Sequence, residues 1–159
     1  METLRDHYRD RWGLDVRILQ VMTVEETAQL PSGQLDAYDL AYQLQRAYEA
    51  EVAPVAVIGF TTHDLNQEDL NFVYGANIAG GYASISTARM DPTPGDPPDE
   101  VLLMERLRKF TTRYIAFTYF DLPLSGNPSS VLSPLSGTHD LDKQGEFPCP
   151  SAPFEMASC

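Results

Sequence analysis

Hydrophobic residues recur along the chain at two spacings, one typical of helices and one typical of strands. Apolar side chains return every three or four positions in residues 4–12, 34–50 and 100–120, which predicts three helices with one apolar face each. Gly13 follows the first of these segments and is expected to end it. The chain is therefore expected to contain one short helix near its start and two long helices further on.

Four other segments have the composition of strands. Residues 15–22 and 82–88 alternate between apolar and polar side chains, as expected of strands with one face in the core and one in water. Residues 52–61 are nearly all apolar and rich in β-branched side chains, which predicts a central strand buried on both faces. Residues 71–75 predict a further strand, joined to the strand at 82–88 through a double glycine.

The order of these patterns predicts an α+β fold with a small mixed sheet packed on two long helices. The 159 residues allow one compact domain and leave no room for two. Residues 23–33 predict a connection with a helical turn, and residues 91–99, with four prolines, predict an exposed loop. We expect a sheet and helix subdomain at 1–121 and an irregular subdomain, rich in proline, serine and glycine, at 122–159.

The net charge of the chain limits the kinds of partner that it can bind. Eleven basic residues stand against 23 acidic ones, which gives a formal net charge of −12. Such a balance argues against binding to nucleic acid or to anionic membrane surfaces. No apolar run approaches the roughly 20 residues of a membrane span, and the first residues lack the apolar core of a secretory signal. We therefore expect a cytoplasmic protein.

A series of short sequence words carries a resemblance to a known family. The words are Gly33-Gln34 with Ala37, Val57-Ile58-Gly59 with Asp64-Leu65, Asn71-Phe72-Val73-Tyr74-Gly75-Ala76, Ser84-Ile85-Ser86 with Arg89, Arg106 to Lys109, Val131-Leu132, and Asp142-Lys143 with Phe147 and Cys149-Pro150. In this order they resemble the archaemetzincins, a family of zinc-dependent peptidases related to the metzincins. The resemblance covers most of the chain and implies a compact metzincin-like domain.

The chemistry of that family rests on the motif HExxHxxGxxHC, followed by CxM and later by a CxxC pair. In a helix the first two histidines lie on one face and hold one Zn²⁺, and the glutamate acts as general base toward the metal-bound water. The family's four cysteines are taken to hold a second, structural zinc. In the present sequence no histidine lies between His63 and His139, so the catalytic motif is absent.

Two alignments locate the positions where the motif would lie. Anchored on Val131-Leu132, the motif positions hold Tyr114, Ile115, Thr118, Asp121 and Leu124, and the following cysteine and methionine positions hold Ser125, Ser130 and Leu132. Anchored on Lys109, the motif positions hold Arg113, Tyr114, Phe117, Phe120 and Pro123. Neither register supplies a zinc ligand, and the distal pair keeps Cys149 but has Ala152 in the second position.

Hydrocarbon side chains and a neutral phenol cannot bind Zn²⁺ or take a proton from its water at neutral pH. We therefore expect no zinc and no other cofactor. A rebuilt metal site is an alternative, because His139, Asp140 and Asp142 lie within four residues and Cys149 or Asp121 could join them. The other interpretation of the same residues, which we favour, is an exposed polar turn whose side chains cap backbone groups.

Two functions from different classes follow. The first is a catalytically inactive pseudoprotease that binds a protein or an extended peptide. In metzincin-type peptidases an edge strand above the cleft pairs with the substrate backbone, so the resemblance points to residues 82–88, with Tyr82, Ser84 and Ser86 as peptide-binding residues. The alternative is a metal-dependent peptidase or hydrolase with a rebuilt site that uses His139, Asp142 or Cys149. A structural subunit for a basic partner is a third possibility.

Overall fold

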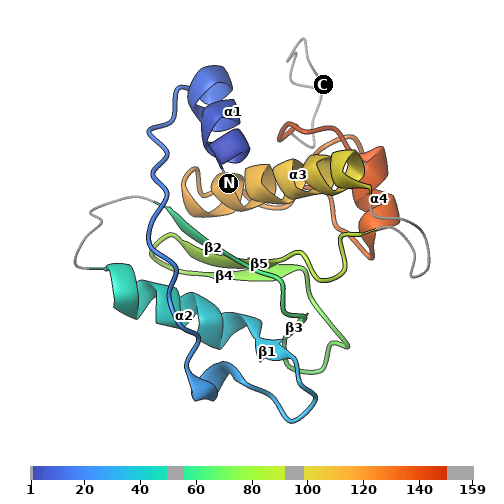
Figure 1. The fold of residues 1–159 in the computed structure, drawn as a ribbon. Coiled ribbons are helices and arrows are strands. Elements are labelled where there is room, and N and C mark those ends of the chain that lie inside the picture. Colours follow the sequence, from blue (N-terminus) through green and yellow to red (C-terminus); the bar gives the residue numbers. More distant parts are fainter. Residues whose placement is uncertain (1, 50–55, 92–98, 150–159) are drawn as a thin grey trace.

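The fold is a small sheet between two long helices. The computed structural model describes residues 2–49, 56–91 and 99–149. Helix α2 (Ala37–Tyr48) packs on one face of a three-stranded sheet, and helix α3 (Glu100–Thr118) packs on the other (Figure 1). The remaining elements are α1 (Glu2–Trp12), η1 (Glu26–Ala28), β1 (Leu35–Asp36), β2 (Val57–Thr61), β3 (Leu65–Asn66), β4 (Gly75–Ile78), β5 (Tyr82–Ser86) and α4 (Thr138–Lys143). The predicted α+β architecture is confirmed.

The three-stranded sheet has the order β2-β5-β4, and the short strands β1 and β3 form a second, parallel pair. β5 runs parallel to β2 and antiparallel to β4. The prediction that residues 52–61 form the central strand is wrong, because β2 lies at the edge of the sheet; residues 52–55 lie outside the described residues. The apolar run arises because Val57 packs against α2 while Ile58 and Phe60 pack into the cluster around α1 and α3.

The prediction of one solvated face on the strand at 82–88 is also wrong. All five residues of β5 are buried, including its two serines. Ser84 Oγ donates a hydrogen bond to Ala37 O (2.9 Å), and Ser86 Oγ donates to His63 O (2.6 Å). The polar side chains therefore satisfy carbonyl groups inside the protein, so their alternation with apolar residues does not mark exposure to water.

The predicted strand at residues 15–22 does not form. This segment is extended but belongs to neither sheet, since no strand of the described residues lies beside it to share hydrogen bonds. Its apolar side chains are accordingly left outside: Val21 is 99% exposed and Ile18 is 50% exposed. The helical turn predicted between residues 23 and 33 is present as η1.

The three predicted helices are present with defined ends. α1 ends before Gly13, whose φ of 64° lies in the left-handed region that glycine adopts without strain. α2 begins three residues later than predicted because Asp36 accepts a hydrogen bond from the Asp39 N–H (2.9 Å) and caps it. Asp99 caps α3 in the same way through the Leu102 N–H (3.0 Å).

The chain from residue 122 to residue 149 is irregular apart from α4. Basic side chains of α3 attach it to the rest of the molecule: Lys109 Nζ donates to Leu141 O (3.1 Å), and Arg106 pairs with Asp142. Leu141 itself is completely buried in the main core cluster. Most of the proline-rich loop predicted at 91–99, and the last ten residues, lie outside the described residues.

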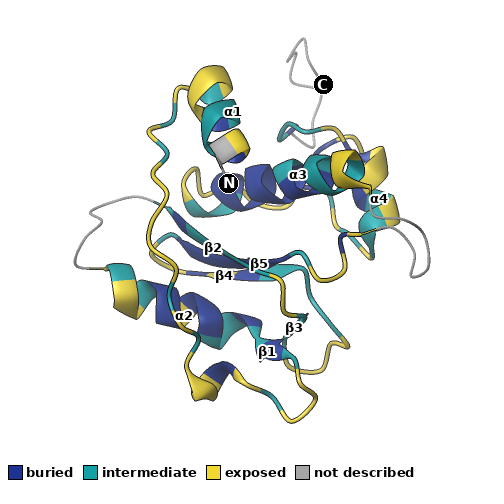
Figure 2. Ribbon diagram, in the orientation of Figure 1, coloured by how far each residue is buried: buried dark blue, intermediate teal, exposed yellow. Residues whose placement is uncertain are grey.

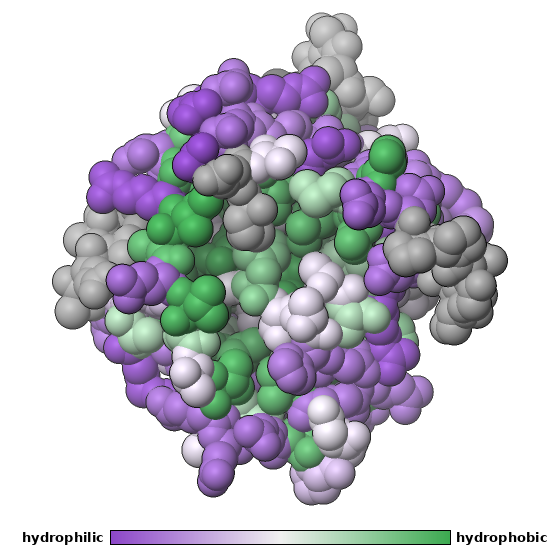
Figure 3. All heavy atoms as spheres, viewed as in Figure 1, coloured by the Kyte–Doolittle hydropathy of each residue, from purple (hydrophilic) through white to green (hydrophobic). Residues whose placement is uncertain are grey.

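Buried residues line the sheet and the helix faces that touch it (Figure 2). Hydrophilic side chains form most of the rim of the face drawn in Figure 3, and hydrophobic side chains gather in a hollow at its centre. Within the described residues, each helix is too short or too polar to cross a membrane.

Candidate functional site

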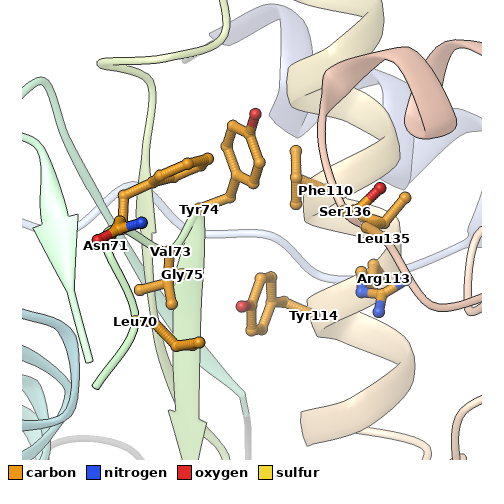
Figure 4. Close-up of a pocket in the computed structure, with 11 residues that line it drawn as sticks. Leu70, Asn71, Val73, Tyr74, Gly75, Phe110, Arg113, Tyr114, Leu135 and Ser136 are labelled. Atoms are coloured by element: carbon orange, nitrogen blue, oxygen red, sulfur yellow. The ribbon is translucent and has the colours of Figure 1, made fainter. Parts of the chain in front are cut away.

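A pocket of about 400 Å³ opens between the start of β4 and helix α3 (Figure 4). Residues 70–75 form one wall, and Phe110, Arg113 and Tyr114 of α3 form the opposite wall. Leu135 and Ser136, from the irregular segment before α4, close a third side. The pocket therefore lies where both alignments place the first position of the missing zinc motif.

Hydrogen bonds from a cluster of polar side chains hold the wall formed by residues 70–75 in place. Gln34 Nε2 donates to both Asn71 O and Asp64 Oδ2, each at 2.9 Å. Arg89 binds the Asp64 carboxylate through Nε (2.8 Å) and Nη2 (2.7 Å), and its guanidinium lies 4.2 Å from the centre of the Phe72 ring. The hydrogen bond from Arg89 is the main reason that the pKa of Asp64 is lowered. Asp64 therefore serves to hold the wall in place.

Gly75 allows the two walls to approach closely. A Cβ atom at this position would overlap the Ser84 carbonyl oxygen and would lie 2.9 Å from Tyr114 Oη. Real Cβ atoms do not approach neighbours so closely in a packed interior. A glycine at residue 75 therefore lets the Tyr114 side chain lie directly against the backbone of β4.

Tyr114 is buried, with 7% of its surface exposed, and its hydroxyl faces Gly75 across the pocket (Figure 4). Within the described residues this hydroxyl makes no hydrogen bond. Burial raises the pKa of Tyr114, so the phenol is neutral at physiological pH. The ring packs edge-on against Phe117, with 5.9 Å between ring centres. The pocket thus contains a polar group that is ready to bond to a ligand.

Arg113 is a buried cation at the other side of the pocket. Its Nη1 donates to Val131 O and to Ser133 O, each at 2.8 Å, and its guanidinium lies 5.1 Å from the centre of the Phe117 ring. Burial lowers the pKa of Arg113. The other eight arginines each lie within 3.9 Å of a carboxylate oxygen, whereas Arg113 has no carboxylate partner among the described residues.

The residues at the other motif positions pack in the core, form hydrogen bonds within the protein or are exposed. Ile115 and Leu132 are buried, and Thr118 Oγ1 donates to Tyr114 O (2.6 Å). Asp121 adopts a φ of 50°, and Leu124 is 56% exposed. In the second register, Phe117 contacts Tyr114 and Phe120 is 45% exposed. These positions do not converge on the pocket; only Arg113 and Tyr114 line it.

Two serines lie beside Cys149, at positions that the first register assigns to cysteines. Ser125 Oγ donates to Cys149 O (2.6 Å), and Ser130 Oγ accepts hydrogen bonds from the Cys149 N–H (2.8 Å) and the Leu132 N–H (3.1 Å). The first register is thus favoured, since it brings three of the four expected cysteine positions together. Hydroxyl groups bonded to the backbone occupy the place of the expected thiolates.

The residues present do not fit a zinc ion. Tyr114, Ile115 and Thr118 offer neither an imidazole nor a carboxylate, and nowhere in the described chain do three His, Cys, Asp or Glu side chains come close enough to hold a metal. The alternative ligands are also engaged elsewhere. Arg106 binds both Asp142 oxygens (2.8 and 2.6 Å), and Asp140 accepts a hydrogen bond from the Ser136 N–H (3.0 Å). His139, Asp142 and Cys149 are therefore not brought together.

The predicted peptide-binding edge at residues 82–88 is wrong, because β5 is the central strand and pairs on both sides. Tyr82, Ser84 and Ser86 are buried with it. The free edge on this side of the sheet belongs to β4, which begins at the pocket. Sequence reasoning missed it because a glycine and an asparagine in a four-residue strand give little strand signal.

The hydrogen-bond pattern shows which backbone groups of β4 face outward. The Ser86 N–H donates to Tyr74 O (2.8 Å), and Tyr74 lies opposite Ser86 in the antiparallel register. Bonded and non-bonded pairs alternate in such a ladder, so the backbone groups of Gly75 and Asn77 point away from β5. Asn77 is exposed. The outer edge of β4 is therefore unpaired within the described residues from Gly75 onward, whereas just before it the Val73 N–H of the pocket wall donates to Leu65 O of β3 (2.9 Å).

Comparisons with known proteins agree with this description. No family model matches the chain. Over 108 residues it is 34% identical to the archaemetzincin of Pyrococcus furiosus, a match that covers 67% of this chain and 54% of that protein. The chain thus spans about half the length of the curated relative that it matches.

Solved structures extend the likeness to most of the fold. The archaemetzincin of Methanopyrus kandleri is 28% identical with a TM-score of 0.76, over 93% of this chain and 78% of that chain. The archaemetzincin of Archaeoglobus fulgidus matches at 22% identity and a TM-score of 0.74, over 93% of this chain and 86% of its own. A zinc-dependent peptidase of Methanocorpusculum labreanum matches at 18% identity and a TM-score of 0.74, over 92% of this chain and 87% of its own. In sequence and in fold, this chain is therefore archaemetzincin-like.

Proposed function

We propose that this chain is a non-catalytic archaemetzincin-like domain that binds an extended peptide along the outer edge of β4. The observation that carries the proposal is the free edge of β4, which begins at a preformed pocket. Main-chain groups of Gly75 and Asn77 are available there, and adding a strand to a sheet edge uses such groups rather than a metal. The central position of β5 and the free edge of β4 support a peptide site at β4 rather than at residues 82–88.

The loss of catalysis follows from the residues that replace the family motif. The positions of the first histidine and the glutamate hold Tyr114 and Ile115 in the register that the Cys149 contacts favour. A neutral phenol is a poor zinc ligand, and an aliphatic side chain cannot act as a general base.

Replacing Asn77 by proline is expected to weaken peptide binding about tenfold, because one outward main-chain donor is lost and the ring obstructs the edge. Binding is measured by affinity selection from a library of N-acetylated heptapeptides, followed by calorimetric titration of a selected peptide. The ladder between β4 and β5 does not use the Asn77 N–H, so the variant is expected to stay folded by circular dichroism.

The matched control for this variant is Asn77→Ala, which removes the side chain and keeps the N–H. It is expected to bind the selected peptide within about twofold of the unchanged chain, since Asn77 is exposed and contributes its backbone. Equal binding by the proline variant, or a selection that yields no peptide, would contradict binding along this edge.

The absence of catalysis has its own test. The chain is expected to give no cleavage of a broad fluorogenic peptide library above the buffer rate, with added Zn²⁺ or without it, because no general base and no ligand set are present. Cleavage that a chelator removes would show that the chain is a metal-dependent hydrolase. In that case variants at His139, Asp142 and Cys149 would identify its ligands.

A further inference from the structure

We infer that the pocket beside Gly75 binds the C-terminal carboxylate of the extended peptide, with Arg113 facing the charge and Tyr114 donating a hydrogen bond to it. The inference rests on the proposed function, since it assigns the end and the direction of the peptide on β4. It depends on residues at positions where the family has its zinc motif, and so describes a property of this chain.

The first argument is the charge balance of Arg113. Arg113 is 9% exposed as a whole residue and lines the pocket, and within the described chain only two backbone carbonyls accept hydrogen bonds from its guanidinium, both from Nη1. Nε and Nη2 have no acceptor there. Buried charges are ordinarily paired, and a carboxylate is the partner that best matches the guanidinium fork.

Arg106 shows the usual arrangement, seven residues before Arg113 and two turns earlier on the same helix. Arg106 is equally buried and binds both oxygens of Asp142. In a chain with a net charge of −12 and 23 acidic residues, a buried arginine without a carboxylate leaves a place for an anion from outside.

The second argument is the Tyr114 hydroxyl. Tyr114 as a whole is nine-tenths buried, its hydroxyl faces the pocket, and no described residue accepts its proton. An acceptor on a ligand in the pocket could take the hydrogen bond that this hydroxyl makes with no described residue. A neutral phenol and a cation are both donors, and together they favour a ligand that only accepts.

The third argument is direction. β4 runs from Gly75, at the pocket, to Ile78. A peptide that pairs antiparallel with β4 runs the opposite way, toward Gly75. Because Leu65 of β3 pairs with Val73 on the same edge, such a peptide would end at Gly75, with its last residue beside the pocket. The pocket walls contributed by Leu70, Phe110 and Leu135 are apolar. The favoured C-terminal residue therefore has an apolar side chain and a free carboxylate.

The test uses two matched pairs of probes on the full chain. Benzoate and benzamide have the same shape and differ in charge, and each selected heptapeptide is prepared as the free acid and as the C-terminal amide. Benzoate is expected to bind at least ten times more tightly than benzamide and to shift the Arg113 Nε–H resonance in NMR spectra. The free-acid peptide is expected to bind about ten times more tightly than its amide.

Tyr114→Phe keeps the ring packing and removes the donor, so it is expected to weaken benzoate and the free-acid peptide about tenfold while leaving the amide almost unchanged. Tyr42→Phe is the control, because Tyr42 is 49% exposed and lies outside the pocket. Arg113→Lys is a second variant that keeps the positive charge but loses the fork.

Equal affinity for acid and amide, in a chain whose peptide binding Asn77→Pro weakens about tenfold, would overturn the carboxylate site and leave the proposed function standing. Benzoate binding without any peptide binding would show a site for small carboxylic acids. It would overturn both the assignment of the pocket to a peptide C-terminus and the proposed function. Benzoate binding that Tyr114→Phe does not weaken, with no shift at Arg113, would place the ligand elsewhere and overturn the inference.

Discussion

Asp142→Asn is expected to destabilise the protein by about 2 kcal/mol, because it leaves the Arg106 guanidinium buried without a counter-charge. Arg106 is 8% exposed in its side chain and binds Asp142 through Nε (2.8 Å) and Nη2 (2.6 Å). Its Nη1 also donates to Met90 O (2.7 Å), so the arginine cannot turn out to water without losing this bond. Asp142 is 31% exposed, which keeps the expected cost below that of a fully buried pair.

The effect of Asp142→Asn should depend on pH in a defined direction. Hydrogen bonding to Arg106 is the main cause that lowers the pKa of Asp142 in the folded state. A carboxyl group whose pKa is lower in the folded than in the unfolded state contributes stability above its unfolded pKa and loses it as pH falls through the folded value. The difference between the two proteins is thus constant near neutral pH and shrinks below about pH 4.

Urea unfolding at several pH values, followed by circular dichroism, measures this difference. Asp15→Asn is the control, since Asp15 and Arg17 form a pair in which both side chains are about four-fifths exposed. Removing this surface carboxylate is expected to change the unfolding free energy by less than about 0.5 kcal/mol. An unfolding midpoint of Asp142→Asn that matches the unchanged chain at pH 7 would contradict the role assigned to the Arg106 pair.

Gly75→Ala is expected to cost about 2 to 3 kcal/mol, because the new methyl group meets the backbone of β5 on one side and Tyr114 on the other. The Ser84 carbonyl oxygen belongs to the central strand and cannot move without breaking the ladder, and Tyr114 Cζ would lie only 3.0 Å away. The variant is also expected to lose peptide binding, since the methyl group would occupy the entrance of the pocket. Thermal unfolding and calorimetric titration measure the two effects.

Two other glycines separate the steric effect from the general effect of replacing glycine. Gly59→Ala would meet only the tip of the Leu44 side chain, at 2.6 Å, so a smaller loss of about 1 kcal/mol is expected. Gly137→Ala has no neighbour within 4 Å and an extended φ of −178°, so its stability should be unchanged or slightly raised. Addition of Tyr114→Phe to Gly75→Ala should recover part of the loss; the same loss in both backgrounds would show that Tyr114 does not contact this position.

The helices of this fold could be predicted from the sequence, whereas the order of the strands could not. Helix periodicity is a local property, and it located α1, α2 and α3 to within a few residues. The position of a strand in a sheet depends on partners far away in the chain. Alternation at 82–88 suggested a solvated face, but the acceptors that keep Ser84 and Ser86 inside are Ala37 O and His63 O. No local pattern contains that information.

The candidate site was predictable only in part for the same reason. Aligning the family motif identified Tyr114 and Arg113, because their places follow from spacing along one helix. The opposite wall of the pocket comes from residues 70–75, which lie far from α3 in the sequence. That Arg113 lacks a carboxylate partner among the described residues can be recognised only when the ion pairs of the other arginines are known. These are properties of distant residues brought together by the fold.

Three basic side chains of α3 hold the irregular C-terminal segment, Arg106 through the Asp142 carboxylate and the other two through the backbone. Arg106, Lys109 and Arg113 follow one another at intervals of three and four residues, which places them along one side of the helix. Lys109 and Arg113 donate to the carbonyl oxygens of residues 131, 133, 141 and 142. A carbonyl oxygen is the same in every amino acid, so this attachment survives most side-chain changes in the segment. Leu135 and Ser136, which line the pocket, can therefore change, and with them the choice of ligand, without loss of this attachment.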